Sequence, residues 1–158
     1  MSLTLVPMTD DQFAPLRVGL EQAYAEDLAG ARGLSPEAAR AESLAQIDRD
    51  LPDGVATPGV LLRMALVDGE EVGWIWTTLP DADRPTMAWI HNIEVHPAHR
   101  GHGHARRMIQ LAEAELARLG VGQLGLNVFG HNTVAIRLYD SLGFQVTSQH
   151  MVKPLPPS

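Results

Sequence analysis

The sequence contains no cysteine among its 158 residues. Disulfide bonds, thiolate metal ligands and a cysteine nucleophile are therefore excluded, and any catalysis has to proceed without a cysteine-bound intermediate. The lack of disulfides fits a reducing compartment. At this length a chain buries roughly two thirds of the surface that its unfolded form exposes, so a hydrophobic core can form without cross-links.

Long apolar runs and an excess of positive charge are also absent. No run approaches the roughly 20 apolar residues that cross a bilayer, and the first residues show no basic segment followed by an apolar core. Nineteen acidic against twelve basic side chains give a formal net charge of −7. This balance disfavours nucleic acids and anionic membranes and mildly favours cationic partners. We therefore expect a cytoplasmic protein that binds neither nucleic acid nor membrane.

Helix and strand signals succeed one another without an internal repeat or a low-complexity linker. Thr9 or Asp10 can cap one helix, Ser35 followed by Pro36 can start another, and the turn at 68–69 joins two apolar runs as a hairpin. These patterns predict one mixed α/β domain over residues 1–158. The predicted order is a strand at 3–8, helices at 10–30 and 36–51, strands at 60–67, 71–79 and 87–95, a helix ending at 119, a strand at 123–129, a short helix after 132, and a last strand from 144 to about 152.

The most informative stretch runs from Ile93 to Ala105, where a strand ends and a turn rich in histidine and glycine leads into a helix. Unpaired N–H groups at a helix start favour anions, and glycines such as Gly101 and Gly103 let a phosphate approach the main chain closely. A dinucleotide fingerprint is excluded, because Arg106 stands where a third small residue is required. No Gly-Lys-Ser/Thr run is present for a nucleoside triphosphate loop.

Arg100, Gly103 and Ala105 fit the pattern Arg/Gln-x-x-Gly-x-Gly/Ala, and in this context the turn resembles the pyrophosphate signature of the GNAT superfamily of N-acetyltransferases. Residues 126–144 are similar to the strand and helix that follow this signature in the family. Stretches within residues 51–76 resemble a bacterial subgroup of unassigned substrate. The chain is therefore identified as a member of this superfamily.

The resemblance implies the GNAT fold, with a central, mostly antiparallel sheet of about six to seven strands flanked by four helices. The sheet is expected to splay between the strands that end at Val95 and Phe129. An acetyl-CoA binding core is expected at about 87–144 and acceptor-side helices at about 10–51. The implied activity is direct transfer of an acetyl group from acetyl-CoA to a primary amine of a small molecule or peptide, in a ternary complex. Homodimers are common in the superfamily, so the resemblance also allows a homodimer.

Acetyl-CoA is the cosubstrate that the resemblance implies, and no metal is expected. Backbone groups at the end of the strand before the turn would pair with pantetheine, and the amides of the turn would hold the diphosphate. Asn132 would contact the pantetheine arm, although its position also suits a helix cap. The residues expected to bind the cosubstrate are Ile93, Val95, Arg100, Gly101, His102, Gly103, His104, Ala105 and Asn132.

Three residues are candidates for the proton transfers. By its place in the family motif, Tyr139 would protonate the leaving thiolate, although it also suits an ordinary core position. His91 resembles in position a catalytic histidine of arylalkylamine acetylases, and Glu94 is a second candidate for the base. Because strand side chains alternate, His91 and Glu94 are expected on opposite faces unless a bulge intervenes. A water relay is a third route. Asn127 stands where the ribosomal-protein N-terminal acetylases carry a catalytic glutamate, which weakens an analogy with them.

Two other functions compete with catalysis. A GNAT fold could hold acyl-CoA as a sensor without turnover, because a fold does not establish an activity. Alternatively, the chain could be a histidine-rich metal-binding protein, because four histidines in the turn have spacings that could suit a transition metal. These histidines are His96, His99, His102 and His104.

Overall fold

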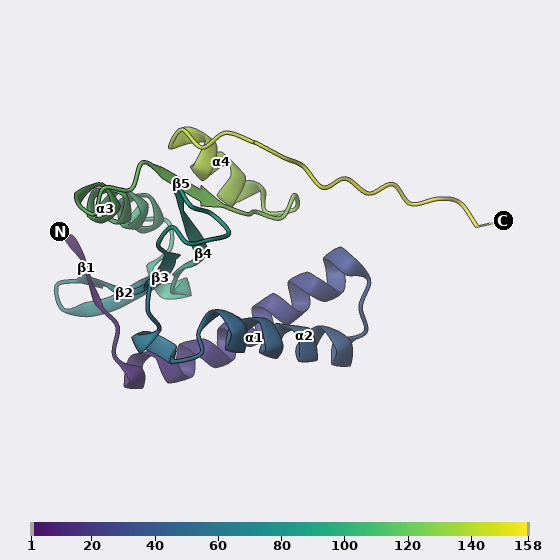
Figure 1. Cartoon of the computed structure of the whole chain (residues 1–158), viewed down its shortest axis with the longest axis horizontal. Helices are drawn as coiled ribbons and strands as arrows, with labels where there is room; N and C mark the ends of the chain where they lie inside the picture. Colours follow the sequence, from purple (N-terminus) through teal and green to yellow (C-terminus); the bar gives the residue numbers. More distant parts are fainter. Residues whose placement is uncertain (1, 158) are drawn as a thin grey trace.

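The computed structural model describes residues 2–157, so the first and last residues of the predicted domain lie outside it. Four α-helices and five β-strands follow in the order that the sequence predicts up to residue 141 (Figure 1). Short 3-10 helices lie at Gly54–Ala56 and Pro97–His99. The elements are β1 (Leu3–Pro7), α1 (Asp10–Arg32), α2 (Pro36–Asp50), β2 (Val60–Val67), β3 (Glu70–Thr78), β4 (Met87–Val95), α3 (His104–Arg118), β5 (Gln123–Leu126) and α4 (Thr133–Ser141).

The five strands form one mixed sheet in the order β1-β2-β3-β4-β5. The first three pairings are antiparallel, as the hairpin signal between β2 and β3 predicts, and β4 pairs with β5 in parallel. A parallel pair needs a crossover, and α3 supplies it between β4 and β5. Both edges of the sheet, β1 and β5, lie at the ends of this order.

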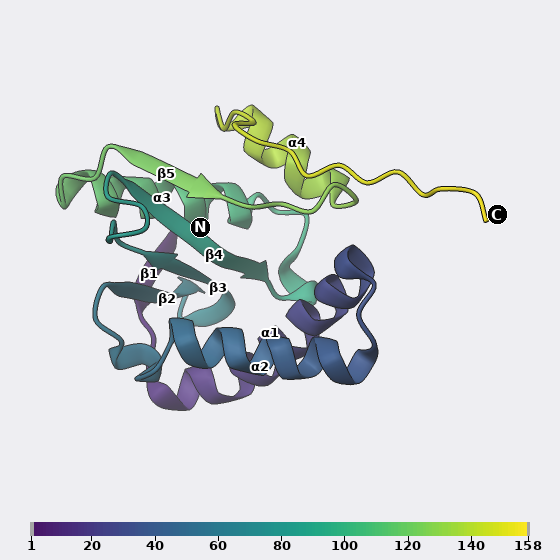
Figure 2. The same cartoon turned by 45° about the vertical axis from the view of Figure 1, so that its right-hand side comes forward.

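Helices cover both faces of the sheet (Figures 1 and 2). On one face, α3 contributes Met108, Ile109 and Ala112 to a core that includes Val72 and Ile75 of β3. On the other face, α1 and α2 pack over Trp74 and Trp76 of the same strand. From Trp74 to Trp76 the side chains of β3 alternate between the two cores. Val72 breaks this alternation, because it is an extra residue of β3 in the register with β2 and lies on the α3 side.

The capping signals of α1 and α2 are confirmed. Thr9 accepts a hydrogen bond from the Gln12 amide at 3.2 Å, and the Gln12 side chain accepts one from the Thr9 amide at 2.9 Å, which completes a capping box. Ser35 caps α2 by accepting from the Ala38 amide at 3.2 Å, with Pro36 in the first turn.

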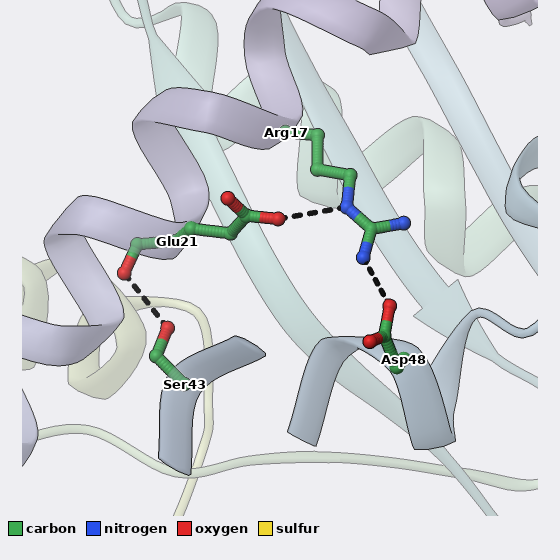
Figure 3. A network of polar contacts seen from close by, with 4 residues as sticks. All are labelled: Arg17, Glu21, Ser43 and Asp48. Carbon is green, nitrogen blue, oxygen red and sulfur yellow. Dashed lines mark hydrogen bonds and ion pairs between the residues drawn. The ribbon is translucent and has the colours of Figure 1, made fainter. Parts of the chain in front are cut away.

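A polar network joins α1 to α2 (Figure 3). Arg17 on α1 donates from Nε to Glu21 at 2.8 Å and from Nη2 to Asp48 on α2. The buried Ser43 hydroxyl of α2 donates to the Glu21 carbonyl at 2.7 Å. Glu21 therefore helps to hold the two helices together through both its carboxylate and its backbone carbonyl.

The glycine at position 73 allows β3 and β4 to lie close together. It pairs with Val95, and an added Cβ would collide with the Glu94 carbonyl oxygen and approach the Val95 Cα to 3.1 Å. We expect Gly73→Ala to lower the free energy of unfolding by about 1–3 kcal/mol, because overpacking forces backbone shifts. Urea unfolding measures this loss, and Gly19→Ala is the matched control, because nothing lies within 4 Å of an added Cβ there. Equal changes in both variants would contradict the steric argument.

The prediction of a last strand from residue 144 to about 152 is wrong. Residues 144–157 contain no helix or strand, and the described part of the sheet has five strands instead of the six to seven expected. Figures 1 and 2 show this segment leaving the body beyond α4 as an extended trace. The physical reason is that a strand needs a hydrogen-bonding neighbour, and side-chain pattern alone does not supply one.

Candidate active site

The sheet opens between β4 and β5, which we call the fork. The two strands pair only over Met87–Ile90 and Gln123–Leu126. Residues 92–95 continue to pair with β3 but have no partner on β5. Figure 2 shows the two strands moving apart toward their carboxyl ends. The predicted splay is thus present, although β5 ends at Leu126 instead of Phe129.

A bulge in β4 begins where the strands part. Trp76 of β3 pairs with Asn92, and Thr77 pairs with Ile90, so His91 is an extra residue on β4. Such a bulge interrupts the alternation of side chains along a strand. The exception allowed for a bulge therefore applies, and His91 and Glu94 do not lie on opposite faces, because each contacts a tryptophan of the α1 and α2 face.

His91 lies flat against the indole of Trp76. The ring centroids are 4.5 Å apart and the planes differ by 21°. Burial lowers the pKa of His91, an effect partly opposed by the charge of Asp50 and reinforced by that of Arg84. Since the ordinary pKa of histidine is near 6.5, this imidazole is neutral at pH 7. A neutral imidazole can accept a proton.

Glu94 has polar partners on the same face. One carboxylate oxygen accepts from Trp74 Nε1 at 3.3 Å, and the other lies 3.8 Å from His96 Nδ1. The carboxylate therefore already carries out a structural role, which is to satisfy the indole N–H of the fully buried Trp74.

Asn92 was not predicted as a site residue. Within the described residues, its buried Nδ2 and the buried Nε1 of the neighbouring Trp76 have no hydrogen-bond partner. Buried polar atoms normally find partners, so these two donors, beside His91 and at the start of the fork, are available to a ligand or to water. Only the tertiary structure reveals this, because a single asparagine in an apolar strand carries no distinctive sequence signal.

The predicted anion-binding turn follows β4 directly. Gly101 and Gly103 have φ values of 82° and 78°, the left-handed region that favours glycine. Gly103 is the N-cap of α3 and provides no side-chain hydrogen bond to the first turn of the helix, which begins at His104 and Ala105. N–H groups at such a helix start have no intrahelical partner. No atom lies within 4 Å of a Cβ added at either glycine, so a phosphate has room to approach.

Arg100 connects this turn to the end of β4. Its Nε donates to the Val95 carbonyl at 3.0 Å, while the residue as a whole is exposed. The His96 amide donates to the Val72 carbonyl at 2.8 Å and extends the pairing of β3 and β4 into the turn. Ile93 and Val95 pack partly against the α3-side core. The turn is therefore held at the mouth of the fork, and the Arg100 guanidinium keeps its remaining donors for an anion.

Three of the turn histidines, His99, His102 and His104, line one small hollow of about 170 Å³. His99 Nε2 lies 3.4 Å from a Glu70 carboxylate oxygen, and the rings of His102 and His104 stack at 5.8 Å. Among residues 2–157, no three His, Cys, Asp or Glu side chains are grouped so that they could hold a metal ion. The geometry gives no support to the metal-binding alternative.

The helix α4 carries two predicted residues. Asn132 is its N-cap and accepts from the Ala135 amide at 3.3 Å, so its side chain performs the capping role that the sequence allowed. Tyr139 is half-buried against the α3-side core and contacts Phe144 edge-on, with ring centroids 5.7 Å apart. Burial raises the pKa of Tyr139, so its hydroxyl keeps its proton at neutral pH. Asn127, just past β5, is exposed.

Ionisable side chains of α1 and α2 lie on the same side of the sheet as His91. Asp50 at the end of α2 is close enough to affect the pKa of His91. Burial raises the pKa of Asp27 on α1, and the nearby His131 opposes this rise. The loop after β5 thus lies near α1, and Asp27 and Asp50 place two acidic groups on the His91 side of the sheet.

A hollow lies at the opposite end of β4 and β5 from the fork. It measures about 670 Å³ and its lining contains no ionisable side chain, so it offers no group for proton transfer. It is lined by Leu79, Pro80, Pro85, Thr86, Leu119, Gly120, Val121, Gly122 and Gln123.

Known proteins of similar sequence are acetyltransferases of the GNAT family. The model of the acetyltransferase (GNAT) family matches residues 21–144. The chain is 30% identical over 156 residues to YycN, an uncharacterized N-acetyltransferase of Bacillus subtilis (strain 168), and the match covers 98% of this chain and 100% of YycN. It is 28% identical to YdgE, another uncharacterized N-acetyltransferase of the same organism, over 98% of this chain and 99% of YdgE.

Solved structures share the fold over nearly the whole chain. The crystal structure of YycN matches with a TM-score of 0.91 and 29% identity, over 99% of this chain and 100% of that one. The PaiA N-acetyltransferase from Thermoplasma acidophilum, solved in complex with coenzyme A, has a TM-score of 0.70 and 17% identity, over 95% and 94% of the two chains. No helix among residues 2–157 is both long and apolar enough to span a membrane. The chain belongs to the acetyltransferase (GNAT) family and is an acetyl-CoA-dependent N-acetyltransferase.

Proposed function

We propose that this enzyme transfers the acetyl group of acetyl-CoA directly to the primary amine of a small molecule or peptide, with both substrates bound at once. The observation that carries the proposal is the position of the glycine turn at the mouth of the fork. A thioester held at the fork would be reachable from the α1 and α2 face, where His91 lies, and from α4, which carries Tyr139. Because the chain has no cysteine, no thiol of the enzyme takes part.

Acetyl-CoA would bind along the end of β4. The amides from Gly101 to Ala105 and the free donors of Arg100 would hold the diphosphate, since helix N-termini and guanidinium groups both favour phosphate oxygens. Ile93 and Val95, which lack partners on β5, would pair with the pantetheine arm through the main chain. Asn132 would contact the same arm through its side-chain NH2 group, because its side-chain oxygen caps α4.

We assign the base to His91 in preference to Glu94. The amine must lose a proton as it attacks, and the burial of His91 keeps its imidazole neutral near pH 7. Glu94 already accepts the indole N–H of Trp74. Asp27 and Asp50 add negative charge on the same side of the sheet and would favour a cationic acceptor.

In the proposed reaction, two side chains carry out the two proton transfers. The amine nitrogen attacks the thioester carbonyl carbon, and the nitrogen–carbon bond forms as His91 takes a proton from the amine. The carbon–sulfur bond then breaks, and the Tyr139 hydroxyl gives its proton to the departing thiolate. The products are the acetylated amine and free coenzyme A, and bulk water restores both side chains. A burst of acetylated protein in the absence of an acceptor would contradict direct transfer.

The first test is calorimetric titration with acetyl-CoA. We expect one-to-one binding, weakened about 10-fold in Arg100→Ala, which corresponds to about 1.4 kcal/mol, because the variant loses a charged phosphate donor. Arg118→Ala, at the far end of α3, is the matched control for the loss of one positive charge and should bind normally. Equal weakening in both variants would indicate a general charge effect and contradict the role of Arg100.

A second measurement separates catalysis from sensing. The release of coenzyme A, detected by its free thiol, is measured with a panel of primary amines. Cationic small molecules are tested first, because the acidic groups near His91 favour them. An enzyme raises thiol release above background hydrolysis with at least one acceptor. Tight acetyl-CoA binding with no acceptor-dependent release across the panel would favour the sensor alternative.

A further inference from the structure

The positive charge of Arg84 is held at a defined place beside β4. Arg84 belongs to the loop between β3 and β4, and its guanidinium carbon lies 4.0 Å from the centroid of the Trp89 ring. A guanidinium over an indole face makes a cation–π contact, which favours this one position of a flexible side chain. Arg84 is therefore fixed more firmly than an ordinary loop arginine.

A glycine on β5 makes room for the indole of Trp89. Gly125 pairs with Trp89 in the parallel ladder. A Cβ added at Gly125 would lie 2.8 Å and 2.9 Å from two ring carbons of Trp89 and would collide with the sulfur of Met87. The ring thus occupies the space that a side chain at position 125 would need, and it lies across β4 and β5 just before the fork opens.

Arg84 and Trp89 lie on the same side of the sheet as His91. Ile90 belongs to the α3-side core, so the side chain of its neighbour Trp89 lies on the opposite face. His91 lies on that face too, stacked against Trp76. Burial lowers the pKa of His91, and the charge of Arg84 lowers it further, so the guanidinium is within electrostatic reach of the imidazole. The cation and the candidate base therefore border one space.

The guanidinium of Arg84 has no anionic partner in the part of the chain that the structure describes. None of the ion pairs among residues 2–157 includes it. The nearby Asp81 instead uses a carboxylate oxygen to accept from the backbone amides of Asp83 and Arg84, at 2.9 Å and 3.0 Å. A guanidinium has five N–H donors in a planar arrangement that matches two oxygens of one anion. These donors can therefore serve a ligand.

Acidic groups complete the charge pattern of this space. The charges of Asp50 and Asp81 both oppose the lowering of the pKa of His91, so both carboxylates are within electrostatic reach of it. Two negative charges and one positive charge favour a molecule that carries both a protonated amine and an anionic group. A carboxylate suits a single guanidinium better than a phosphate does, because a phosphate would bring a charge of about −1.5 to −2 close to the two carboxylates.

We propose, on the basis of the acetyl transfer proposed above, that the amine acceptor also carries a carboxylate, and that Arg84 binds this carboxylate while the amine nitrogen lies beside His91. An acceptor without the carboxylate leaves the half-buried guanidinium without its partner, and such a loss discriminates strongly between analogues. Arg84 is thus a specificity-determining residue, and free amino acids are the simplest acceptors of this class.

Matched pairs of acceptors test the proposal. The release of coenzyme A is measured with glycine, β-alanine, 4-aminobutyrate and larger α-amino acids, each beside its own carboxamide. We expect kcat/KM to be about 10- to 100-fold higher for the carboxylate in at least one pair, since a charged hydrogen-bonded pair is lost in the carboxamide. The carboxamides have less basic amines and thus more free amine at pH 7, so amine ionisation works against the expected preference. Phosphoethanolamine tests a phosphate in place of the carboxylate.

Arg84→Gln removes the charge and keeps a planar group that can lie over Trp89. The ratio of kcat/KM between carboxylate and carboxamide should fall to about 1 in this variant, chiefly through the carboxylate-bearing acceptor. Calorimetric titration with acetyl-CoA shows whether the cosubstrate site is intact. Arg118→Gln, at the far end of α3, is the matched control for the loss of one positive charge and should keep the wild-type ratio.

Three results would overturn the proposal. Equal kcat/KM for both members of every pair in the wild type would exclude a carboxylate site. A preference for phosphoethanolamine would replace the carboxylate by a phosphate. Equal losses for carboxylate and carboxamide in Arg84→Gln would show that Arg84 only holds its loop against Trp89.

Failure of acetyl transfer itself gives a different result, which is no acceptor-dependent release of coenzyme A with any amine. In that case the protein loaded with coenzyme A is titrated with the same pairs by calorimetry. Binding that is selective for the carboxylate and weakened about 10-fold or more in Arg84→Gln would support the carboxylate site without turnover. Absence of selective binding would overturn it.

Discussion

Replacing Tyr139 with phenylalanine should lower kcat about 100-fold while leaving the affinity for acetyl-CoA nearly unchanged. A positioned general acid contributes about 10²–10⁴-fold to a rate, and the thiolate would otherwise leave without a proton donor. The substitution keeps the ring, so its packing against Phe144 is retained. Steady-state kinetics give kcat, and calorimetry gives the acetyl-CoA affinity of the same preparation.

Tyr24→Phe is the matched control for this experiment. Tyr24 lies on α1 and, like Tyr139, has a pKa raised by burial, but the proposed mechanism does not use it. We expect wild-type kcat in this variant. Equal losses of kcat and acetyl-CoA affinity in Tyr139→Phe would contradict the acid role and indicate that the hydroxyl holds structure instead.

The second large effect is expected for His91→Gln, which should lower kcat/KM about 100-fold at pH 7 and change the pH profile. Burial lowers the pKa of His91, so the imidazole is neutral at pH 7 and becomes protonated only below its ordinary value of about 6.5. In the wild type, kcat/KM should therefore be level near neutral pH and fall at more acid pH. In the variant this acid limb should be absent.

Glu94→Gln is the discriminating control. The amide oxygen can still accept from Trp74 Nε1, so the contact is conserved while the negative charge is lost. If His91 is the base, this variant retains most of its activity and its acid limb. A larger loss in Glu94→Gln than in His91→Gln would transfer the base role to Glu94. Small losses in both would favour the water relay.

The comparison of sequence and structure is clearest at the turn after β4. Gly101 and Gly103 lie in the left-handed region and open α3, as the motif predicts. This agreement has a local cause, because a few residues near one another in sequence determine the dihedral angles of a turn and the start of a helix. The caps at Thr9 and Ser35 are confirmed for the same reason.

The arrangement of His91 and Glu94 could not be predicted in this way. Alternation along β4 separates them, and only the offset between Trp76–Asn92 and Thr77–Ile90 brings them to one face. A bulge depends on how two strands far apart in sequence align, so neither strand records it alone. The same register places Asn92 opposite Trp76, whose side-chain donors both lack a partner among the described residues.

The sequence by itself determined the order of the elements up to α4 and the glycine turn, because these follow from short-range spacing. Its resemblance to the GNAT superfamily indicated the family and marked Arg100 and Tyr139 as candidates. Only the tertiary structure decided which faces the β4 side chains share, that Glu21 serves the joint between α1 and α2, and that residues 145–153 remain outside their own sheet. Those features depend on contacts between distant segments. Side-chain pattern favours a strand but does not specify the neighbour that completes it.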